Sequence, residues 1–391
     1  MRVRLGEVFE AQITGEWGNE CSEDEIGTNI LRTTNFTSYG NVDYSNVVVR
    51  SVTKSKVEEK KLRYGDIILE KSGGTDKIPV GRVVFCDQLI ENDTYLCNNF
   101  TQAMRVKSEL AFPRYVFYFM WYLHYSGRTD LLQNKTTGIR NLQIKAYLNE
   151  KVSLPSFDEQ HKIAEVLDKI NDLIAKRRNQ LNRLEELIKS RFIEMFGDPV
   201  SNSCRLPEAT LPELGEFGRG VSKHRPRNAP ELLGGSYPLI QTGEVASANL
   251  YVTSYSNTYS EMGFRQSKMW NKGTLCITIA ANIAKTAILG FDACFPDSVV
   301  GFNANERANN IYIHYWFSFF QTILEAQAPE SAQKNINLKI LSELKVIVPS
   351  VDKQNEFAAF VQQTDKLELV AQKSLEKLEI LKKSLMQQYF G

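Results

Sequence analysis

The 391-residue sequence lacks the features that identify several common classes of protein. Its six cysteines include no CxxC pair, so neither a disulfide framework nor a zinc site is indicated, and free thiols in a reducing compartment are expected. The most apolar run, "YVFYFMWYLHY" from Tyr115, is far shorter than the roughly 20 residues that cross a bilayer. The N-terminal "MRVRLGEVFE" lacks the apolar core of a signal peptide. We therefore expect a soluble, cytoplasmic protein.

The sequence also lacks an excess of charge of either sign. The formal net charge is +1, from 47 Lys and Arg against 46 Asp and Glu. A protein that mimics DNA is expected to be strongly acidic, whereas a nucleic-acid-binding protein needs only a local basic face. With 42% apolar and 24% charged residues, the composition is that of a globular protein, and the length suits two or three domains of about 150 residues each.

Motifs for catalysis are missing as well. No glycine-rich loop with the setting of a nucleotide or S-adenosylmethionine site is present, and the four histidines share no metal-ligand spacing. No Asn-Pro-Pro-Tyr or Asp-Pro-Pro-Tyr segment, the clamp of adenine methyltransferases, occurs. Asp43, Glu58 and Lys60 imitate a nuclease set, but a solvated charge run explains "KVEEKK" better. We expect no catalytic residues, no metal and no cofactor in this chain.

What the sequence does contain is a long internal repeat. The segment "LPSFDEQHKIAEVLDKI" begins at Leu154, and "VPSVDKQNEFAAFVQQT" begins at Val348, 194 residues later. This shift is far longer than the 20 to 50 residues of a solenoid repeat, so it indicates a duplicated half. The same shift, without a gap, aligns Asn141/Asn335, Lys145/Lys339, Pro155/Pro349, Ser156/Ser350, Asp158/Asp352, Gln160/Gln354, Leu184/Leu378, Phe196/Phe390 and Gly197/Gly391.

Each copy of the motif is predicted to begin a long helix. Apolar residues follow at steps of three and four, Ser156 with Glu159 fits a capping box, and Gly197 fits a helix end. A helix from 158 to 196 would be about 58 Å long. Two such helices can bury narrow apolar seams against each other, although each could instead pack on its own domain. The predicted helix-pair interface comprises Ile163, Ile170, Leu181, Leu184, Leu187, Leu367, Leu375, Leu378 and Leu381.

Before each helix lies a segment rich in β-forming residues and in Gly, Asn and Ser turns, ending in an aromatic helix. The two segments also resemble each other, as "NILRTTNF" from Asn29 and "PLIQTGEV" from Pro238 illustrate. We predict an α+β protein with two mixed α/β domains, each followed by one of the long helices. The predicted boundaries are 1–153, 154–197, 198–347 and 348–391.

Polar, basic and glycine-rich loops recur at matching places in the two domains. Cations suit phosphates, amides and hydroxyls suit base edges, and glycines allow a close backbone approach, so we predict contacts with double-stranded DNA. The first domain supplies Arg32, Thr33, Thr34, Asn35, Lys71, Ser72, Gly73, Gly74, Lys135, Thr137 and Arg140. The second supplies Arg219, Lys223, His224, Arg225, Arg227, Gln241, Thr242, Asn282, Lys285 and Lys334.

At these residues the chain resembles the specificity subunits of type I restriction-modification systems. The resemblance rests on the two long-helix regions and on "SKHRPRNAPELLGGSYPLIQTGEV" and "GDIILEKSGG" in the domains. It implies two target-recognition domains in a pseudo-twofold arrangement, separated by an antiparallel pair of long coiled-coil helices. Each domain would read part of a split DNA site, with the helix pair setting the spacing. It also implies a non-catalytic chain with two methyltransferase subunits and restriction subunits as partners, which would carry S-adenosylmethionine, ATP and Mg.

One departure from the family pattern concerns the second helix region. Lys353 replaces the capping Glu159 of the first copy, and Thr364 replaces Ile170, so the two methyltransferase sites are not expected to be equal. A coiled-coil scaffold or inactive relative without direct DNA readout remains the alternative. Salt-dependent binding to duplex DNA distinguishes the two hypotheses, because only phosphate contacts produce it.

Overall fold

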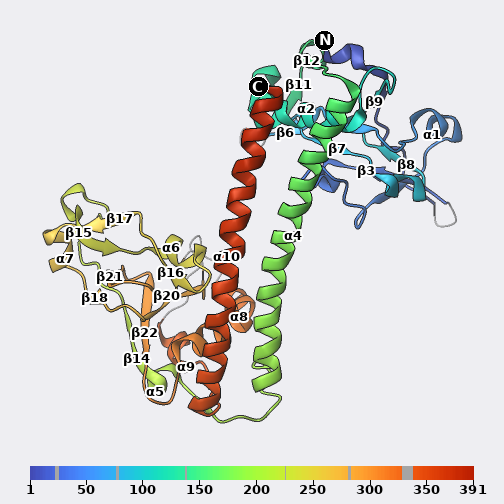
Figure 1. Ribbon diagram of the computed structural model, residues 1–391. Helices are drawn as coiled ribbons and strands as arrows, with labels where there is room; N and C mark the ends of the chain where they lie inside the picture. The colour runs from blue at the N-terminus through green and yellow to red at the C-terminus, as the bar shows by residue number, and fades with distance from the viewer. Residues whose placement is uncertain (23–25, 76–78, 137–138, 225, 281–282, 328–337) are drawn as a thin grey trace. The chain divides into compact units, whose positions relative to one another are not determined.

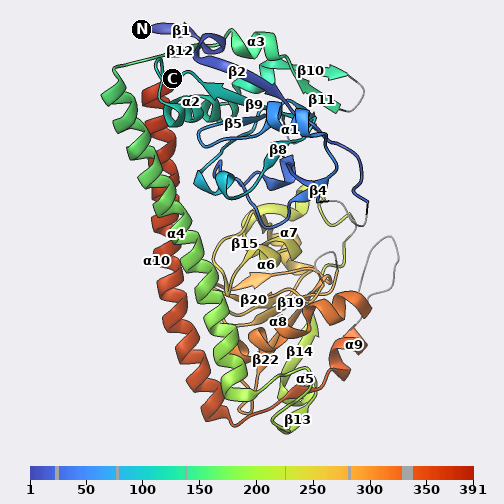
Figure 2. The same cartoon turned by 90° about the vertical axis from the view of Figure 1, so that its right-hand side faces the viewer.

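The computed structural model describes residues 1–22, 26–75, 79–136, 139–224, 226–280, 283–327 and 338–391. They form two compact units, Met1–Arg177 with Ser374–Gly391 (unit 1), and Arg178–Lys373 (unit 2) (Figures 1 and 2). Two 40-residue helices, α4 (Phe157–Phe196) and α10 (Val351–Phe390), each contribute one part to each unit. The compact units thus divide the chain differently from the four predicted segments, because both long helices are shared.

Unit 1 is built on a sheet with the strand order β2-β9-β5-β7, in which all pairings are antiparallel. A second sheet has the order β4-β3-β8, a third β10-β11-β6, and β1 pairs with β12. The elements are β1 (Arg2–Arg4), η1 (Leu5–Val8), β2 (Phe9–Thr14), β3 (Thr28–Leu31), η2 (Thr33–Asn35), β4 (Val48–Arg50), α1 (Lys54–Lys60), β5 (Ile67–Glu70), β6 (Ser72–Gly74), β7 (Val83–Phe85), η3 (Gln88–Asn92), β8 (Tyr95–Cys97), β9 (Thr101–Val106), α2 (Pro113–Tyr125), η4 (Arg128–Leu132), β10 (Gln133–Thr136), β11 (Ile139–Leu142), α3 (Ile144–Leu148) and β12 (Lys151–Ser153).

Unit 2 has a main sheet with the order β14-β22-β19-β20-β16, a second sheet β17-β15-β21-β18, and the pair β13-β23. Its elements are β13 (Glu208–Ala209), α5 (Leu211–Leu214), β14 (Gly215–Arg219), η5 (Pro230–Leu232), β15 (Leu233–Leu239), α6 (Thr242–Ser247), β16 (Tyr251–Val252), β17 (Asn257–Tyr259), α7 (Glu261–Arg265), β18 (Met269–Trp270), β19 (Leu275–Thr278), β20 (Thr286–Leu289), β21 (Ala293–Cys294), β22 (Val299–Ala304), α8 (Asn310–Gln327), α9 (Leu338–Glu343) and β23 (Val346–Ile347).

The strand pairings confirm the duplication predicted from the sequence. In chain order, β2, β5, β7 and β9 correspond to β14, β19, β20 and β22, and they take the same places in the main sheets. In the second sheets, β3 lies parallel to β8 and antiparallel to β4, as β15 does to β21 and β17. The aromatic helices α2 and α8 follow the last strand of the main sheet in both copies. The mixed α/β fold is therefore present twice.

The repeated Pro-Ser-x-Asp-x-Gln motif has a structural reason in both copies. Gln160 is buried at the start of α4, where its Oε1 accepts a hydrogen bond from the Phe112 backbone N–H at 2.9 Å and its Nε2 donates to the Pro155 carbonyl at 3.0 Å. Gln354 does the same with Asn309 N–H at 3.0 Å and the Pro349 carbonyl at 2.9 Å. Each glutamine therefore joins the start of a long helix to the start of an aromatic helix.

The aromatic helices are fixed in matching registers. The Tyr115 hydroxyl of α2 donates to the Ser153 carbonyl at 2.7 Å, and the Tyr312 hydroxyl of α8 donates to the Ile347 carbonyl at 2.8 Å. These tyrosines are buried in the two largest apolar clusters, one in each unit, together with residues from both long helices. Thr364, the polar replacement in the second copy, is buried with its hydroxyl bonded to the Phe360 carbonyl at 3.0 Å.

In each unit the parts of α4 and α10 run antiparallel. Arg177 Nε donates to Ser374 Oγ at 3.2 Å in unit 1, and Arg191 Nη2 donates to Glu356 Oε1 at 3.1 Å in unit 2. Of the predicted interface, Ile163, Ile170 and Leu375 are buried, and Leu181, Leu184 and Leu378 are half-buried. The prediction was wrong for Leu187, Leu367 and Leu381, whose exposures are 48%, 57% and 47%.

The cause of this error is that the long helices bury more than a seam. In unit 2, Phe192 of α4 stacks on Tyr312 of α8 and packs edge-on against Phe357 of α10. Each long helix therefore buries a face against the domain of its unit as well as against the other helix. Some of the apolar residues at helical spacing consequently remain exposed to solvent. Within the described residues, no helix combines the length and the apolar character that crossing a membrane requires.

Candidate nucleic-acid interface

In unit 1 the structure brings two of the predicted loop clusters together. Strand β6 carries Ser72 to Gly74, and β11 pairs with it in the register Arg140 to Gly74 and Asn141 to Ser72. Ser72 Oγ donates to Asn141 Oδ1 at 2.5 Å, and the Leu142 N–H donates to the Lys71 carbonyl at 2.8 Å. The hairpin of β10 and β11 pairs Lys135 with Arg140. Cluster residues such as Gly74 and Arg140, which are distant in sequence, thus share one small sheet.

Gly73 is the residue of this sheet that most clearly requires glycine. Its φ is +107°, a value that side chains disfavour, and an added Cβ would meet no atom within 4 Å. Gly73 is exposed, whereas Gly74 is buried. The strand therefore presents open backbone at Gly73, which suits a close approach by a ligand. Thr137 lies outside the described residues.

The second cluster of unit 1 is a short turn at the end of β3. Arg32 caps η2, and Asn35 Oδ1 accepts from the Arg32 N–H at 2.9 Å. The Asn35 amide is buried and donates to the carbonyls of Asp43 and Asn46, so this side chain holds the turn. Arg32 is half-buried, and its buried Nε has no hydrogen-bond partner among the described residues. Thr33 is half-buried and Thr34 exposed.

One loop joins these two clusters. The Asn98 N–H donates to the Leu31 carbonyl at 2.9 Å, and the Lys71 N–H donates to the Phe100 carbonyl at 2.9 Å. Residues 98–100 therefore lie between Arg32 and Lys71. Phe100 is 45% exposed there, an aromatic surface that the sequence reasoning missed. The sequence signal was an aromatic residue in the polar stretch "CNNFT", where burial is not expected.

In unit 2 the loop after β14 carries exposed polar groups. Arg219, Lys223 and His224 are exposed, and the backbone N–H groups of the last two donate to Gln266 Oε1 at 2.6 and 3.0 Å. Arg227 forms an ion pair with Asp297, so its charge is partly neutralised within the unit. Arg225, Asn282 and Lys334 lie outside the described residues.

Gln241 and Arg32 occupy equivalent positions in the two units. Gln241 caps α6 and its N–H donates to Glu244 Oε2 at 3.2 Å, which repeats the arrangement of Arg32 with Asn35. Gln241 follows β15 as Arg32 follows β3, and it is exposed, whereas Thr242 is half-buried. The same backbone frame thus presents a guanidinium in one copy and an amide in the other.

Lys285 belongs to another segment of unit 2. It precedes β20 and lines a pocket formed with α6, with α8 and with the parts of α4 and α10 that belong to unit 2. Among the described residues, no group of three His, Cys, Asp or Glu side chains is arranged to hold a metal ion. The imitated nuclease set is not assembled as a site, since Lys60 pairs with Glu16 at 2.9 Å and Asp43 accepts from the Ser45 N–H.

Comparison with known proteins agrees with this arrangement. The family model of the type I restriction modification DNA specificity domain matches residues 1–186 and 209–379. The putative type I restriction enzyme MjaX specificity subunit of Methanocaldococcus jannaschii is 20% identical over 379 residues, which cover 93% of this chain and 87% of that protein.

Two solved structures have a similar fold along the whole chain. The S subunit of a type I restriction-modification system from M. genitalium has a TM-score of 0.61 at 15% identity, covering 100% of this chain and 96% of that one. A chain from work on complex assembly and conformational transition of the type I R-M system has a TM-score of 0.55 at 15% identity, covering 100% and 97%. With the family model matched in both halves, the chain belongs to the type I restriction-modification DNA specificity family, as a specificity subunit with two target-recognition domains.

Proposed function

We propose that each target-recognition domain reads one half of a split DNA sequence. The observation that carries this proposal is the pair Arg32 and Gln241, which stand in the same capping arrangement but differ in side-chain chemistry. Arginine suits the O6 and N7 atoms of guanine, and glutamine suits the N6 and N7 atoms of adenine. Two copies of one fold with different groups at the same place would read two unlike half-sites.

The surrounding residues supply the other contacts that DNA binding needs. In unit 1, Lys71 and Arg140 flank the exposed backbone of Gly73, a combination that suits a phosphate. In unit 2, Arg219 and Lys223 are exposed on one loop and its β14 strand. Asn35 is left out of this set, since its amide is used within the turn.

The long helices are the proposed docking sites for two methyltransferase subunits. The duplicated positions Leu173/Leu367 and Leu187/Leu381 all carry leucine, and the exposures are 45%, 57%, 48% and 47%. Leucines that are exposed at the same positions of both copies suit a partner that binds each copy in the same way. The chain itself would be non-catalytic, with S-adenosylmethionine, ATP and Mg bound by methyltransferase and restriction subunits. The complex would act in the cytoplasm, where its DNA is.

The test is to co-express the chain with the methyltransferase subunit of its host and to map modified adenines across the genome by single-molecule sequencing. The expected result is a split motif with two unlike halves. Gln241→Ala should relax the bases of one half, and Arg32→Ala those of the other. A stable complex that modifies no sequence would instead favour the scaffold alternative.

A further inference from the structure

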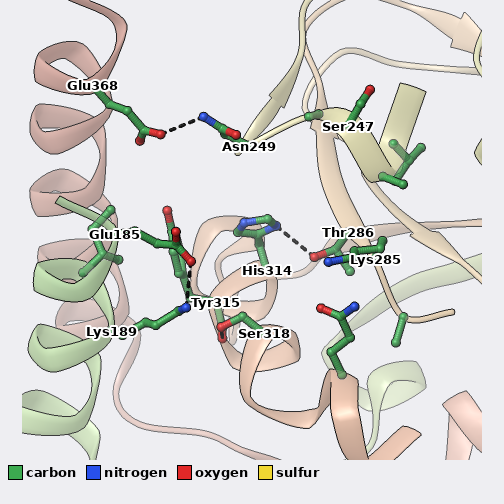
Figure 3. Close-up of a pocket in the computed structure, with 16 residues that line it drawn as sticks. Glu185, Lys189, Ser247, Asn249, Lys285, Thr286, His314, Tyr315, Ser318 and Glu368 are labelled. Atoms are coloured by element: carbon green, nitrogen blue, oxygen red, sulfur yellow. Dashed lines mark hydrogen bonds and ion pairs between the residues drawn. The ribbon is translucent and has the colours of Figure 1, made fainter. Parts of the chain in front are cut away.

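One pocket of unit 2 takes no part in the proposed recognition of DNA. Its volume is about 340 Å³, and Figure 3 shows the side chains that line it, which come from α4, α6, α8, α10 and the start of β20. One wall is formed by α4 and α10, which contribute Glu185 and Glu368. The opposite wall contains Lys285 beside β20, and His314 on α8 lies between the two walls. The pocket is therefore lined by charged groups of both signs.

The wall formed by the long helices is acidic. Glu185 pairs with Lys189 at 2.7 Å, and Glu368 accepts from Asn249 Nδ2 at 2.7 Å. Burial raises the pKa of the Glu368 carboxyl, and the negative charges of Asp365 and Glu185 raise it further. Burial also raises the pKa of Asp365. Three carboxylates thus stand near one lysine, so a cationic group that entered this side would relieve their repulsion.

Lys285 on the opposite wall differs from Lys189, which pairs with Glu185. No ion pair of Lys285 with a carboxylate is found among the described residues, while its backbone is held by Thr278, whose hydroxyl accepts from the Lys285 N–H at 3.1 Å. At the equivalent position in unit 1, Arg82 is bound through two bonds of 2.9 and 2.8 Å by Glu70. Unit 2 has Thr278 in place of that glutamate, so the cation of Lys285 remains available to an anion.

His314 adds a polar group without charge. Its side chain is 8% exposed, and Nδ1 is hydrogen-bonded to Thr286 Oγ1 at 2.9 Å, which leaves Nε2 turned away from Thr286 (Figure 3). Burial lowers the pKa of His314 to about 4, so the imidazole is neutral at pH 7. A buried neutral imidazole on a pocket wall can exchange one hydrogen bond with a ligand.

Unit 1 provides an internal comparison, because α2 and α8 are held in the same register. The equivalents of His314 and Ser318 are Phe117 and Trp121, and Trp121 is covered by the Lys382 ammonium at 3.7 Å from its ring. The equivalent of Glu368 is Ile174, which is buried. The polar and small side chains of the unit 2 pocket therefore replace large apolar ones, and they are not a requirement of the fold.

We propose that this pocket binds a small zwitterionic molecule that carries an amine and an acid group. The ammonium of the ligand faces the carboxylates of Glu185 and Glu368, and its anionic group faces Lys285. His314 forms a hydrogen bond with the portion of the ligand that lies between its ammonium and its anionic group. Such a ligand would bind between one target-recognition domain and the long helices of the same unit, and so stabilise their packing. The proposal does not depend on which DNA sequence is read.

The test uses the purified full chain and a series of amino acids with increasing separation of the charges: glycine, β-alanine, γ-aminobutyrate and ε-aminocaproate. Butylammonium and butyrate serve as probes with one charge. Titration calorimetry should show that one zwitterion binds at least about tenfold more tightly than either singly charged probe. A tenfold difference in Kd corresponds to about 1.4 kcal/mol of binding free energy. Failure of all four zwitterions to bind at millimolar concentration would overturn the proposal.

Three variants locate the bound ligand. Lys285→Met and Glu368→Gln should each lower the affinity about tenfold or more, because each removes the partner of one charge. Ser318→Trp, which introduces the residue of unit 1, should abolish binding by filling the pocket. Lys383→Met, at the position in unit 1 equivalent to Lys189, is the matched control and should leave the affinity unchanged. Binding that is equally strong in all four variants would place the ligand elsewhere and refute the assignment.

Discussion

The glutamines of the repeated motif show how a single residue can fix the position of a long helix. Gln160 and Gln354 are 1% and 0% exposed, and each uses both ends of its amide on backbone groups. A buried backbone N–H that loses its partner costs about 1 to 3 kcal/mol. The motif is therefore explained by packing, and it does not mark a DNA contact.

We predict that Gln354→Leu lowers the free energy of unfolding by about 1 to 3 kcal/mol, because the Asn309 N–H loses its acceptor. Gln160→Leu should have the same effect through Phe112. Urea denaturation followed by circular dichroism measures both. Gln363→Leu, at an exposed site of α10, is the control. A loss no larger than that of the control would show that the motif glutamine is not a structural requirement.

His314 gives unit 2 a dependence on pH. Its ordinary pKa of 6.5 is lowered to about 4 by burial, so the unfolded chain binds the proton more tightly than the folded one. The stability from the neutral imidazole is complete above pH 6.5 and is lost as the pH falls toward 4. A difference of this size corresponds to about 3 kcal/mol.

The corresponding prediction is that His314→Phe, which introduces the residue found in unit 1, reduces the loss of stability between pH 6.5 and pH 4. The expected gain at the acid end, relative to the unmodified chain, is up to about 3 kcal/mol. Thermal unfolding at a series of pH values measures it. His161→Phe, at an exposed site, serves as the control. Parallel pH profiles for His314→Phe and the unmodified chain would contradict the prediction.

At the scale of elements, the long helices combine two kinds of surface. One face packs on the other helix and on the domain of its unit, where Phe192 and Phe196 are fully buried. The other face exposes leucines at the duplicated positions Leu173/Leu367 and Leu187/Leu381. A straight helix gains about 1.5 Å per residue, so helix length is a direct measure of distance along the pair.

If the helix pair sets the gap between the half-sites, shortening both helices should shorten it. Deletion of residues 180–183 together with 369–372 removes about one turn from each, or about 6 Å, which is about two base pairs at 3.4 Å each. Mapping of modified adenines with the shortened chain should give the same half-sites with a shorter spacer. A second variant that lacks only residues 180–183 shortens α4 alone. Comparing its assembly with that of the paired deletion shows whether the two helices must be shortened together. An unchanged spacer in an active complex would show that the spacing is set elsewhere.

At the scale of the whole molecule, DNA binding must arise with almost no net charge. The chain carries +1, so attraction to phosphates depends on local groups such as Lys71, which directly precedes β6, and Arg140, on the neighbouring strand β11. Binding that neutralises phosphates weakens as salt is added, with a logarithmic slope of about 0.9 per phosphate. The slope of affinity against salt concentration therefore measures how many phosphates the protein contacts.

We predict that Lys71→Gln, in the complex with methyltransferase subunits, weakens binding to all duplexes and lowers the salt slope by about 1. The measurement is the dissociation constant for cognate and mismatched duplexes across a range of salt concentrations. Lys169→Gln, which removes a surface ion pair with Glu165 on α4, is the matched control and should leave the slope unchanged. A loss of sequence preference without a change of slope would reassign Lys71 to a base contact.

Much of this architecture could be predicted from the sequence, because it depends on local patterns and on repetition. Heptad-like spacing after the Pro-Ser motif gave both long helices, and the shift of 194 residues gave the duplicated domain. The similar segments that begin at Asn29 and Pro238 lie in β3 and at the end of β15, which take matching places in the second sheets of the two units. Helix periodicity and duplication are properties of the linear chain, so no tertiary information was needed for them.

The tertiary structure alone decided how the polar residues are used. Arg32 and Asn35 are neighbours in sequence, yet Asn35 is buried in a turn, because its amide satisfies two backbone carbonyls. Lys285 and Arg82 are equivalent, yet one faces a pocket and the other is bound by Glu70. The burial of apolar residues on the long helices could not be predicted for the same reason. Each helix packs on the domain of its unit as well as on the other helix, and this packing determines which apolar residues are buried. The burial of a polar side chain and the identity of its hydrogen-bond or ion-pair partner depend on residues that are distant in sequence. A local sequence pattern carries no information about those residues.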